Sequence, residues 1–401
     1  MSSSLVAEIP AKPRIERRIG QVLGKKPGPT LICIGSLHGN EPAGYRALDR
    51  VFATLEAENV EVRGEFLGLV GNCEALRQGK RFLNADLNRH WAPQRVAASR
   101  VGALAHSPVP EDLELHELRQ VLEAAFGRAR GEVYVLDLHT TSGGGPAFVV
   151  MSDTLRNRKF TLQFPAPIIV GLEEELEGTL TDYVMDLGHI AIGFEGGQHD
   201  EPHAVNLCEA GAWIALSAAG IIDAEKVPQV ELSRQFLVRE KRGLPKVFEV
   251  RYRHPVDPDD GFRMEPGFVS FQKIRKGELL ARDRHRELRA QEDGRILMPL
   301  YQKQGEDGYF EMRHFSPFWL RLSALLRRGG LDRVINWLPG VERDPDHHET
   351  LRIDRKVARW YSLQLFHLLG YRRHRSSGDQ LVVTRRQHDF PIKSVGRPGR
   401  R

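Results

Sequence analysis

The feature that most constrains the fold of this chain is its alternation of short apolar runs with amphipathic stretches. Apolar residues recur at helical spacing over 47–55 and 118–126, and a further helix is expected over 202–219. Strands that alternate with helices in this way are typical of an α/β domain with a largely parallel sheet flanked by helices. The candidate strands are residues 31–35, 66–70, 133–138, 148–151, 168–170 and 190–194.

The length of 401 residues predicts more than one domain, and the character of the sequence changes twice. Short β-prone runs separated by turn residues fill 246–312, which predicts a small all-β domain. Beyond Ser316 the sequence looks helical in FWLRLSALLRR, LDRVINWL and KVARWYSLQLFHLL, and it ends in a short strand and a basic tail. We expect three domains, formed by residues 1–235, 236–315 and 316–401.

Several protein classes are excluded by composition. No stretch approaches the ~20 continuous apolar residues that span a bilayer, so a membrane protein is not expected. The first twenty residues carry charges of both signs where a signal peptide needs an apolar core. The cysteines Cys33, Cys73 and Cys208 are far apart and form no C-x-x-C pair, which argues against disulfides and against a thiolate zinc site. We therefore place the protein in the cytoplasm.

Basic charge is concentrated at the C-terminus. The chain has a formal net charge of +5, and residues 371–401 hold nine Lys/Arg against two Asp. A basic segment can bind nucleic acid or another polyanion, but this one lacks the interleaved aromatic residues that stack on bases. We expect a solvated face here, and we do not expect nucleic acid as a partner.

Three candidate strands end next to side chains that bind metals or transfer protons. His38 and Glu41 stand three residues apart in GSLHGNEPAG, His139 follows VYVLDL, and Glu195 follows IAIGF. In open α/β sheets the carboxyl ends of the strands line the ligand crevice. Hydrolytic zinc takes three N/O ligands and keeps one open position, and two His with one Glu are a known set. An isolated H-x-x-E pair is common by chance, so the argument depends on position.

Glu195 is a candidate general base. A carboxylate beside a metal site can take a proton from attacking water and return it to the leaving amine. The glycines of GFEGGQ let backbone and substrate approach closely. Asp137 could orient a histidine ligand or could be a buried polar group bonded to the backbone, and both interpretations stay open. The polar residues of 199–203 are expected in a solvated loop.

The segment RFLNADLNRHW concentrates polar residues among apolar neighbours. Arginine side chains suit the binding of a carboxylate and the stabilisation of a developing oxyanion. The alternative is a loop with surface arginines, which spacing alone would favour. The residues concerned are Arg81, Asn84, Asp86, Asn88 and Arg89.

Four motifs together resemble the succinylglutamate desuccinylase/aspartoacylase family, a branch of the zinc carboxypeptidase-like hydrolases. They are HGNE at 38–41, DLNR at 86–89, DLHTT at 137–141 and FEGG around Glu195. The motifs occur in the family's order, and the resemblance covers about residues 28–220, then more loosely the β segment. It implies a zinc carboxypeptidase-like catalytic domain within residues 1–235, with a central mixed sheet and one zinc ion per chain.

The resemblance also assigns roles to individual residues. It implies a zinc-dependent deacylase that hydrolyses the amide bond of an N-acyl amino acid or a similar small carboxylate-bearing amide. The implied ligands are His38, Glu41 and His139, with Glu195 as the base. Arg81 would stabilise the oxyanion together with zinc, whereas Asn88 and Arg89 would hold a substrate carboxylate.

One departure from the family affects the substrate. Aspartoacylase-like members place a tyrosine and an arginine before the catalytic glutamate to bind a second carboxylate. Here TLTDYVMDLGHIAIGF contains no arginine, and Tyr183 is not at the matching spacing. We therefore expect a substrate other than N-acetylaspartate or N-succinylglutamate.

Two other functions are carried as alternatives. The first is a zinc carboxypeptidase that acts on peptides and would need a longer, open cleft. The second is a non-catalytic zinc-binding module whose basic C-terminus binds a polyanion, although such a module needs no base at Glu195. A small-molecule substrate, no membrane partner and allowance for a homo-oligomer complete the expected interactions.

Overall fold

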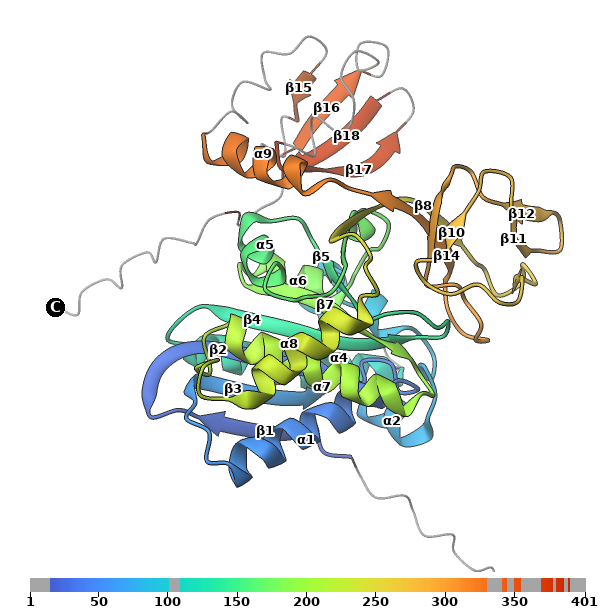
Figure 1. Ribbon diagram of the computed structural model, residues 1–401. Coiled ribbons are helices and arrows are strands. Elements are labelled where there is room, and N and C mark those ends of the chain that lie inside the picture. The colour runs from blue at the N-terminus through green and yellow to red at the C-terminus, as the bar shows by residue number, and fades with distance from the viewer. Residues whose placement is uncertain are drawn as a thin grey trace, which may run out of the picture.

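The computed structural model describes residues 15–100, 109–329, 341–344, 350–354, 369–377, 380–385 and 389. Within these ranges an 11-stranded sheet forms the centre of the protein (Figure 1). Its strands are β1 (Arg18–Leu23), β2 (Lys26–Gly35), β3 (Arg63–Val70), β4 (Val133–Thr141), β5 (Phe148–Met151), β6 (Ile168–Val170), β7 (Ile190–Gln198), β8 (Val247–Pro255), β10 (Lys273–Ile274), β13 (Gly294–Leu297) and β14 (Asp307–His314).

The strand order is β1-β3-β2-β4-β7-β5-β6-β8-β14-β13-β10. β3, β2, β4 and β7 run parallel, and so do β5, β6 and β8. β5 runs antiparallel to β7, which makes the sheet mixed. All six strands predicted from apolar runs are confirmed, and the largely parallel arrangement is confirmed for the half of the sheet that contains them.

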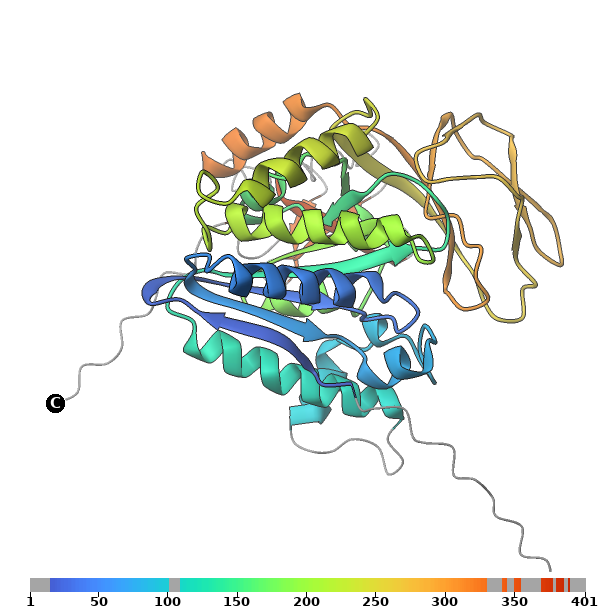
Figure 2. The ribbon, with the colours of Figure 1, turned by 60° about the horizontal axis from the view of Figure 1, so that its bottom comes forward.

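Helices cover both faces of this sheet (Figure 2). α1 and α7 pack together on one face with α8 against α7, while α4 and α6 cover the other. The helices are α1 (Ala43–Ala57), α2 (Cys73–Gln78), α3 (Pro93–Arg100), α4 (Pro110–Arg128), α5 (Leu155–Thr161), α6 (Leu180–Asp186), α7 (Pro202–Ala218) and α8 (Pro228–Glu240), with the 3₁₀ turns η1 (Leu87–Arg89) and η2 (Leu172–Glu174).

The apolar run of β2 shows why the strand signal is so clear. Leu31 and Cys33 pack into the core cluster that includes α1 and α7, whereas Ile32 and Ile34 pack into the cluster that includes α4. A strand buried on both faces needs apolar side chains at every position, and so it appears in the sequence as a continuous run.

Among the helices that the structure describes, none is long and apolar enough to span a membrane.

The predicted β-rich segment is confirmed, but its strands are divided between two sheets. β8, β14, β13 and β10 continue the central sheet. The described strands β9 (Arg263–Met264), β11 (Leu279–Arg282) and β12 (Glu287–Arg289) form a separate three-stranded sheet in the order β12-β11-β9. The domain boundaries at 235 and 315 stay predictions.

The helical extension predicted after residue 316 is confirmed only for α9 (Pro317–Arg328). Residues 331–338 and almost all of 356–369, predicted as helices, lie outside the described ranges, as does the tail 391–401. The described part instead contains a four-stranded antiparallel sheet in the order β15-β16-β18-β17. These strands are β15 (Val341–Arg343), β16 (Thr350–Asp354), β17 (Tyr371–Ser377) and β18 (Gln380–Arg385). An arginine-rich segment such as YRRHRSS, which forms β17, has few of the β-branched and aromatic residues that indicate a strand.

A buried ion-pair network joins α9 to the central part of the protein. The Arg327 side chain is 1% exposed, and its guanidinium lies 2.9 Å from Oδ2 of Asp153 and 3.4 Å from Oδ1 of Asp389. Arg158, which also pairs with Asp153, donates to the Leu320 carbonyl at 2.7 Å. α9 is therefore anchored by charges that are largely buried.

Replacing Arg327 with methionine is expected to lower the free energy of unfolding by about 3–5 kcal/mol, because it removes a buried positive charge that balances the carboxylates of Asp153 and Asp389. Urea denaturation followed by circular dichroism measures the change. Arg328→Met is the matched control, since Arg328 is exposed on the same helix and should change stability by only ~0.5 kcal/mol. Equal midpoints for the two variants would contradict the role of the network.

Candidate metal centre and active site

The turn between β2 and α1 presents His38 and Glu41 from a tightly held loop. Ser36 adopts a positive φ of 58°, and its hydroxyl donates to the Glu41 carbonyl at 2.9 Å. Gly39 has no room for a side chain, since a Cβ there would lie 2.0 Å from a backbone carbonyl carbon of α2. The Gly39 amide donates to the carbonyl of Arg81 at 3.1 Å. The HGNE segment is thus fixed against the segment that contains Arg81.

Two adjacent parallel strands supply His139 and Glu195. His139 in β4 is paired in register with Glu195 in β7, so the two residues lie at the same level of the sheet. Gly196 packs closely on α7, and a Cβ there would lie 2.4 Å from Sγ of Cys208. The glycine after Glu195 is therefore needed for strand–helix packing.

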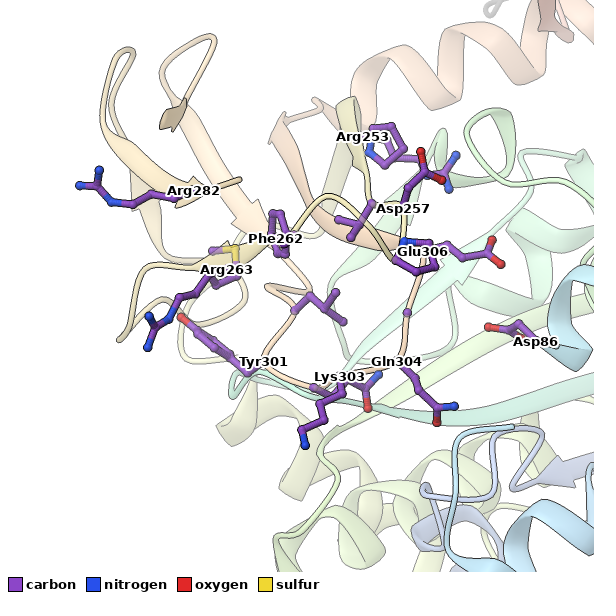
Figure 3. Close-up of a pocket in the computed structure, with 18 of the residues that line it drawn as sticks. Asp86, Arg253, Asp257, Phe262, Arg263, Arg282, Tyr301, Lys303, Gln304 and Glu306 are labelled. Atoms are coloured by element: carbon purple, nitrogen blue, oxygen red, sulfur yellow. The ribbon is translucent and has the colours of Figure 1, made fainter. Parts of the chain in front are cut away.

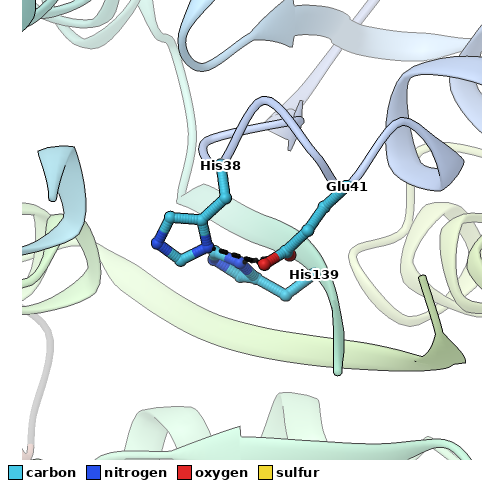
Figure 4. A group of neighbouring side chains, drawn as sticks. All are labelled: His38, Glu41 and His139. Carbon is cyan, nitrogen blue, oxygen red and sulfur yellow. Dashed lines mark hydrogen bonds and ion pairs between the residues drawn. The ribbon is translucent and has the colours of Figure 1, made fainter. Parts of the chain in front are cut away.

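His38, Glu41 and His139 meet at one point (Figure 4). Nδ1 of His38 lies 2.8 Å from Oε1 of Glu41, and Nδ1 of His139 lies 3.1 Å from Oε2. One ligand atom from each residue lies within 4.8 Å of the other two, and all three residues are buried. The structure thus brings together the three proposed ligands in an arrangement that can hold a metal ion.

The outer nitrogen of each histidine faces a second carboxylate. Nε2 of His38 lies 3.0 Å from Oδ1 of Asp86, and Nε2 of His139 lies 2.8 Å from Oδ2 of Asp137. A neutral imidazole has one N–H and one lone pair. If the outer nitrogen of a histidine donates its N–H to the aspartate, the lone pair of the inner nitrogen points at Glu41. The lone pair and the Glu41 carboxylate repel each other unless a positive charge lies between them. The cluster therefore fits a bound cation, which would take the place of extra protons on the histidines.

The charges of this cluster shift the pKa values of its members. Burial opposes ionisation, but attraction outweighs it, so the pKa of Glu41 lies well below and that of His139 well above the ordinary value. For Glu195 burial dominates and raises the pKa to about 8, helped by Glu41 and Asp137 and opposed by His139. Oε2 of Glu195 is buried and finds no hydrogen-bond partner among the described residues. This oxygen is thus available for chemistry.

Arg81 connects the histidine cluster to the polar segment 81–89. Its Nη1 donates to Oε1 of Glu41 at 3.2 Å, and its Nη2 donates to Oδ2 of Asp86 at 3.0 Å. Asp86 also accepts from the Asn88 amide at 2.8 Å and caps η1. The contact between Asp86 and His38 was not predicted from the sequence. The one sequence feature that indicated a buried Asp86 is that its neighbours in the chain are apolar.

Asn88 and Arg89 are bonded to other parts of the chain. Oδ1 of Asn88 accepts from the Leu180 amide at 3.0 Å, and Nη2 of Arg89 donates to Oδ2 of Asp307 at 2.8 Å. Neither residue is among those that line the cavity at the histidine cluster. Their role in holding a substrate carboxylate stays a prediction.

A cavity of about 90 Å³ opens at the cluster. The loop between β13 and β14 forms part of its wall, more than 100 residues away in the sequence, so no local pattern could predict it. His199 also lines it, with Nδ1 2.7 Å from Oγ1 of Thr140, instead of lying in a solvated loop as expected. The lining residues that sequence reasoning missed include Thr140, His199, Gln302, Glu306 and Asp307.

Replacing Asp137 with asparagine is expected to weaken divalent metal binding by about 10–100-fold, because the neutral amide holds the His139 ring less firmly and makes it less basic. Competition with a chromophoric chelator measures the affinity. Asp344→Asn is the control, since Asp344 is also buried and paired with an arginine but lies in the C-terminal sheet region. Equal affinities of Asp137→Asn and the wild type would contradict an orienting role.

Comparison with known proteins agrees with this geometry. Residues 27–211 match the family model of the succinylglutamate desuccinylase/aspartoacylase catalytic domain. The chain is thus similar to this catalytic domain over the segment that contains its four motifs.

Two curated relatives are succinylglutamate desuccinylases. The one from Pseudomonas fluorescens (strain SBW25) is 31% identical over 117 residues, which is 29% of this chain and 32% of that protein. The one from Chromobacterium violaceum is 31% identical over 109 residues, covering 27% of this chain and 30% of that protein. The matched segment therefore spans about a third of the length of these relatives.

Solved structures show the same fold over a larger part of the chain. A succinylglutamate desuccinylase/aspartoacylase from Rhodobacter sphaeroides has a TM-score of 0.54 and 20% identity, covering 74% of this chain and 88% of that one. The product-bound ectoine utilization protein EutE (DoeB) from Ruegeria pomeroyi also has a TM-score of 0.54 and 20% identity, over 73% and 88%. At this identity the likeness establishes the fold alone.

Proposed function

We propose that this protein is a zinc-dependent deacylase that hydrolyses the amide bond of an N-acyl amino acid or a similar small carboxylate-bearing amide. The observation that carries the proposal is the convergence of His38, Glu41 and His139 beside Glu195, whose buried oxygen is unused in the described part of the chain. One zinc ion per chain, held by these three ligands, would polarise the scissile carbonyl and lower the pKa of a water molecule.

Glu195 is assigned the proton transfers. A carboxyl group whose pKa lies near neutrality can take a proton from the attacking water and then give it to the departing nitrogen. Its pairing in register with His139 keeps it beside the proposed metal site through a rigid pair of strands. Proton transfer therefore does not depend on a mobile loop.

Arg81 is assigned to the developing oxyanion. It lines the cavity, and Glu41 and Asp86 hold its guanidinium in place. Its Nε is buried and has no hydrogen-bond partner among the described residues, so one N–H stays available. A fixed donor of this kind stabilises the charge that forms on the carbonyl oxygen in the transition state.

The size of the cavity supports a small substrate, although a larger groove adjoins it. The groove has a volume of about 1240 Å³ and shares Leu300, Gln302 and Glu306 with the cavity wall. An extended peptide could lie there, which favours the carboxypeptidase as second candidate. The cysteines Cys33, Cys73 and Cys208 are far apart in the sequence and form no C-x-x-C pair, which supports a cytoplasmic location.

A screen of N-acyl amino acids and short peptides, followed by release of free amine, tests the proposal. We expect zinc-dependent hydrolysis of at least one N-acyl amino acid and its loss when zinc is removed by a chelator. Hydrolysis confined to the C-terminal residue of peptides would favour the carboxypeptidase. No hydrolysis of any compound by the zinc-loaded protein would contradict both.

A further inference from the structure

Three side chains that line the cavity each have a buried polar atom with neither a hydrogen bond nor an ion pair in the described part of the chain. These atoms are Oε2 of Glu195, Nε of Arg81 and Nε2 of His199. In the proposed function Glu195 is the base and Arg81 is an oxyanion donor. A buried polar atom without a partner costs free energy, and a catalytic role is one reason for keeping it. Nε2 of His199 has no role yet.

His199 is held at the end of the paired strands β4 and β7. Its backbone amide donates to the Thr141 carbonyl at 3.0 Å, which continues the pairing of the two strands. Its Nδ1 lies 2.7 Å from Oγ1 of Thr140. The Thr140 amide in turn donates to Oε2 of Glu41 at 2.9 Å. The imidazole is therefore fixed relative to the proposed metal centre by β4.

The hydroxyl of Thr140 decides which nitrogen of His199 carries the proton. Thr140 is buried, and in the described ranges Nδ1 of His199 is the one hydrogen-bond partner of its hydroxyl. If the ring donated to Oγ1, the hydroxyl hydrogen would have no acceptor, whereas donation by Thr140 to Nδ1 satisfies both groups. Burial lowers the pKa of His199, so the ring is neutral near pH 7. Nε2 therefore carries an N–H.

The β13–β14 loop adds Gln302 to the wall of the cavity, and the same loop lines the larger groove (Figure 3). Oε1 of Gln302 accepts from Nδ2 of Asn40 at 2.8 Å, so the HGNE segment holds this side chain. Gln302 is close enough to His199 to oppose the lowering of its pKa, but Nε2 of His199 has no hydrogen-bond partner among the described residues. The N–H of His199 is thus available to a molecule in the cavity.

The cavity is so small that its contents are close to the reacting atoms. A volume of about 90 Å³ holds only a small group, since one water molecule needs ~10–15 Å³. His199 does not belong to the described cluster of metal-binding side chains, so we assign its N–H to the substrate and not to the metal. The oxygen of an amide accepts hydrogen bonds, whereas its N–H donates them. A donor in this cavity therefore pairs with the carbonyl oxygen.

We propose that His199 is a catalytic residue that donates its Nε2 hydrogen to the oxygen of the scissile carbonyl, together with Arg81 and the proposed metal ion. The inference rests on the proposed deacylase function and adds a residue to its mechanism. When water adds to the carbonyl carbon, the π electrons of the C=O bond move to the oxygen. The hydrogen bond from His199 strengthens as this charge develops, and His199 keeps its proton throughout. A neutral imidazole can polarise a carbonyl in this way without adding a further positive charge beside Arg81.

Substitutions that remove or keep the donor test the proposal. His199→Phe keeps a planar ring without an N–H, and His199→Gln keeps an N–H near the position of Nε2. His203→Phe is the matched control, since His203 lies at the start of α7, pairs with Glu240 at 3.2 Å and does not line the cavity. The zinc-loaded proteins are compared in kcat and KM on the best substrate of the screen, and their metal content and melting temperature are measured on the same samples.

We expect His199→Phe to lower kcat by about 10²-fold and to change KM by less than ~3-fold, because the hydrogen bond gains strength only as the oxyanion forms. His199→Gln should recover part of the loss, and His203→Phe should leave both constants unchanged. A His199→Phe protein that retains zinc and has a normal kcat, with or without a raised KM, would overturn the proposal and leave the deacylase function intact.

Thr140→Val tests the assignment of the proton without changing His199. Without the hydroxyl, the ring proton can move to Nδ1, so kcat should fall by about 10-fold, as is usual when the partner that orients a histidine is lost. In a His199→Phe background the same substitution should have no further effect on kcat, because Thr140 acts through His199. Losses that simply add in the double variant would contradict this link.

Methylphosphonate is a probe that requires no turnover, because it has tetrahedral anionic oxygens and is not hydrolysed. Its dissociation constant is measured by calorimetry with the zinc-loaded wild type, His199→Phe and His203→Phe. We expect binding at least ~10-fold weaker in His199→Phe alone, since a hydrogen bond to a charged oxygen is lost. If the wild type hydrolyses no N-acyl amino acid, the proposed function fails, and this measurement decides the role of His199. Equal dissociation constants, or no binding to any of the three proteins, would overturn it.

Discussion

Replacing Glu195 with glutamine is expected to leave the metal bound and to lower kcat by about 10²–10⁴-fold, the usual contribution of a positioned general base. Glutamine has nearly the same shape but accepts no proton at neutral pH. Because Glu195 lies beside the proposed ligands and is not one of them, metal content should stay near one ion per chain. The loss of activity is then attributable to proton transfer.

Steady-state kinetics on the best substrate of the screen, together with metal analysis of the same samples, measures the effect. Glu311→Gln is the matched control, since Glu311 is also buried with a raised pKa but lies in β14 outside the cavity lining. A Glu195→Gln protein that holds zinc and hydrolyses the substrate at the full rate would contradict the assignment of Glu195 as the general base.

The same substitution should stabilise the metal-free protein at neutral and alkaline pH. Burial raises the pKa of Glu195 to about 8, so the unfolded state loses this proton at lower pH than the folded state does. Between about pH 4.5 and 8 the wild type therefore loses stability with rising pH, at up to about 1.4 kcal/mol per pH unit from this group. The glutamine variant lacks this contribution. Melting temperatures of both proteins in chelator, from pH 5 to 8, measure the difference, and parallel curves would contradict it.

Replacing His38 with alanine is expected to abolish stable metal binding. One of three ligands is removed, so the affinity should fall by more than the ~10–100-fold that follows loss of an outer carboxylate partner. Asp86 and Arg81 would also lose part of the structure they are packed against, because His38 contacts Asp86 at 3.0 Å. We expect near-stoichiometric zinc in the wild type and a trace in the variant.

Metal content measured by mass spectrometry after desalting, together with the melting temperature with and without added zinc, gives two independent readouts. Zinc that binds the folded state should raise the melting temperature of the wild type and not of His38→Ala. His254→Ala is the control, since His254 is equally buried but lies in β8 away from the cavity. A wild-type protein that holds no metal even when zinc is supplied would contradict zinc binding by His38, Glu41 and His139.

The sequence by itself predicted the half of the fold that surrounds the site. The apolar runs of β2, β3, β4 and β7 are local signals, because strands covered on both faces need apolar side chains throughout. Residues next to the ends of those runs had to lie at one edge of the sheet, so the sequence alone predicted that His38, His139 and Glu195 lie close together. The motifs also predicted the resemblance to this family, which the match of residues 27–211 to the family model confirms.

The tertiary structure decided the features that depend on contacts between distant segments. Asp86 is 48 residues from His38, and Asp307 is 218 residues from Arg89. No periodicity or motif in one segment specifies which charge it will meet in another, since that depends on how the β13–β14 loop and the 81–89 segment pack. The sequence predicted one short strand near the C-terminus, where β17 and β18 lie, but not the four-stranded sheet, whose other strands β15 and β16 are only three and five residues long. The sequence therefore indicated the candidate metal ligands and the candidate base, whereas packing determined which side chains line the rest of the cavity.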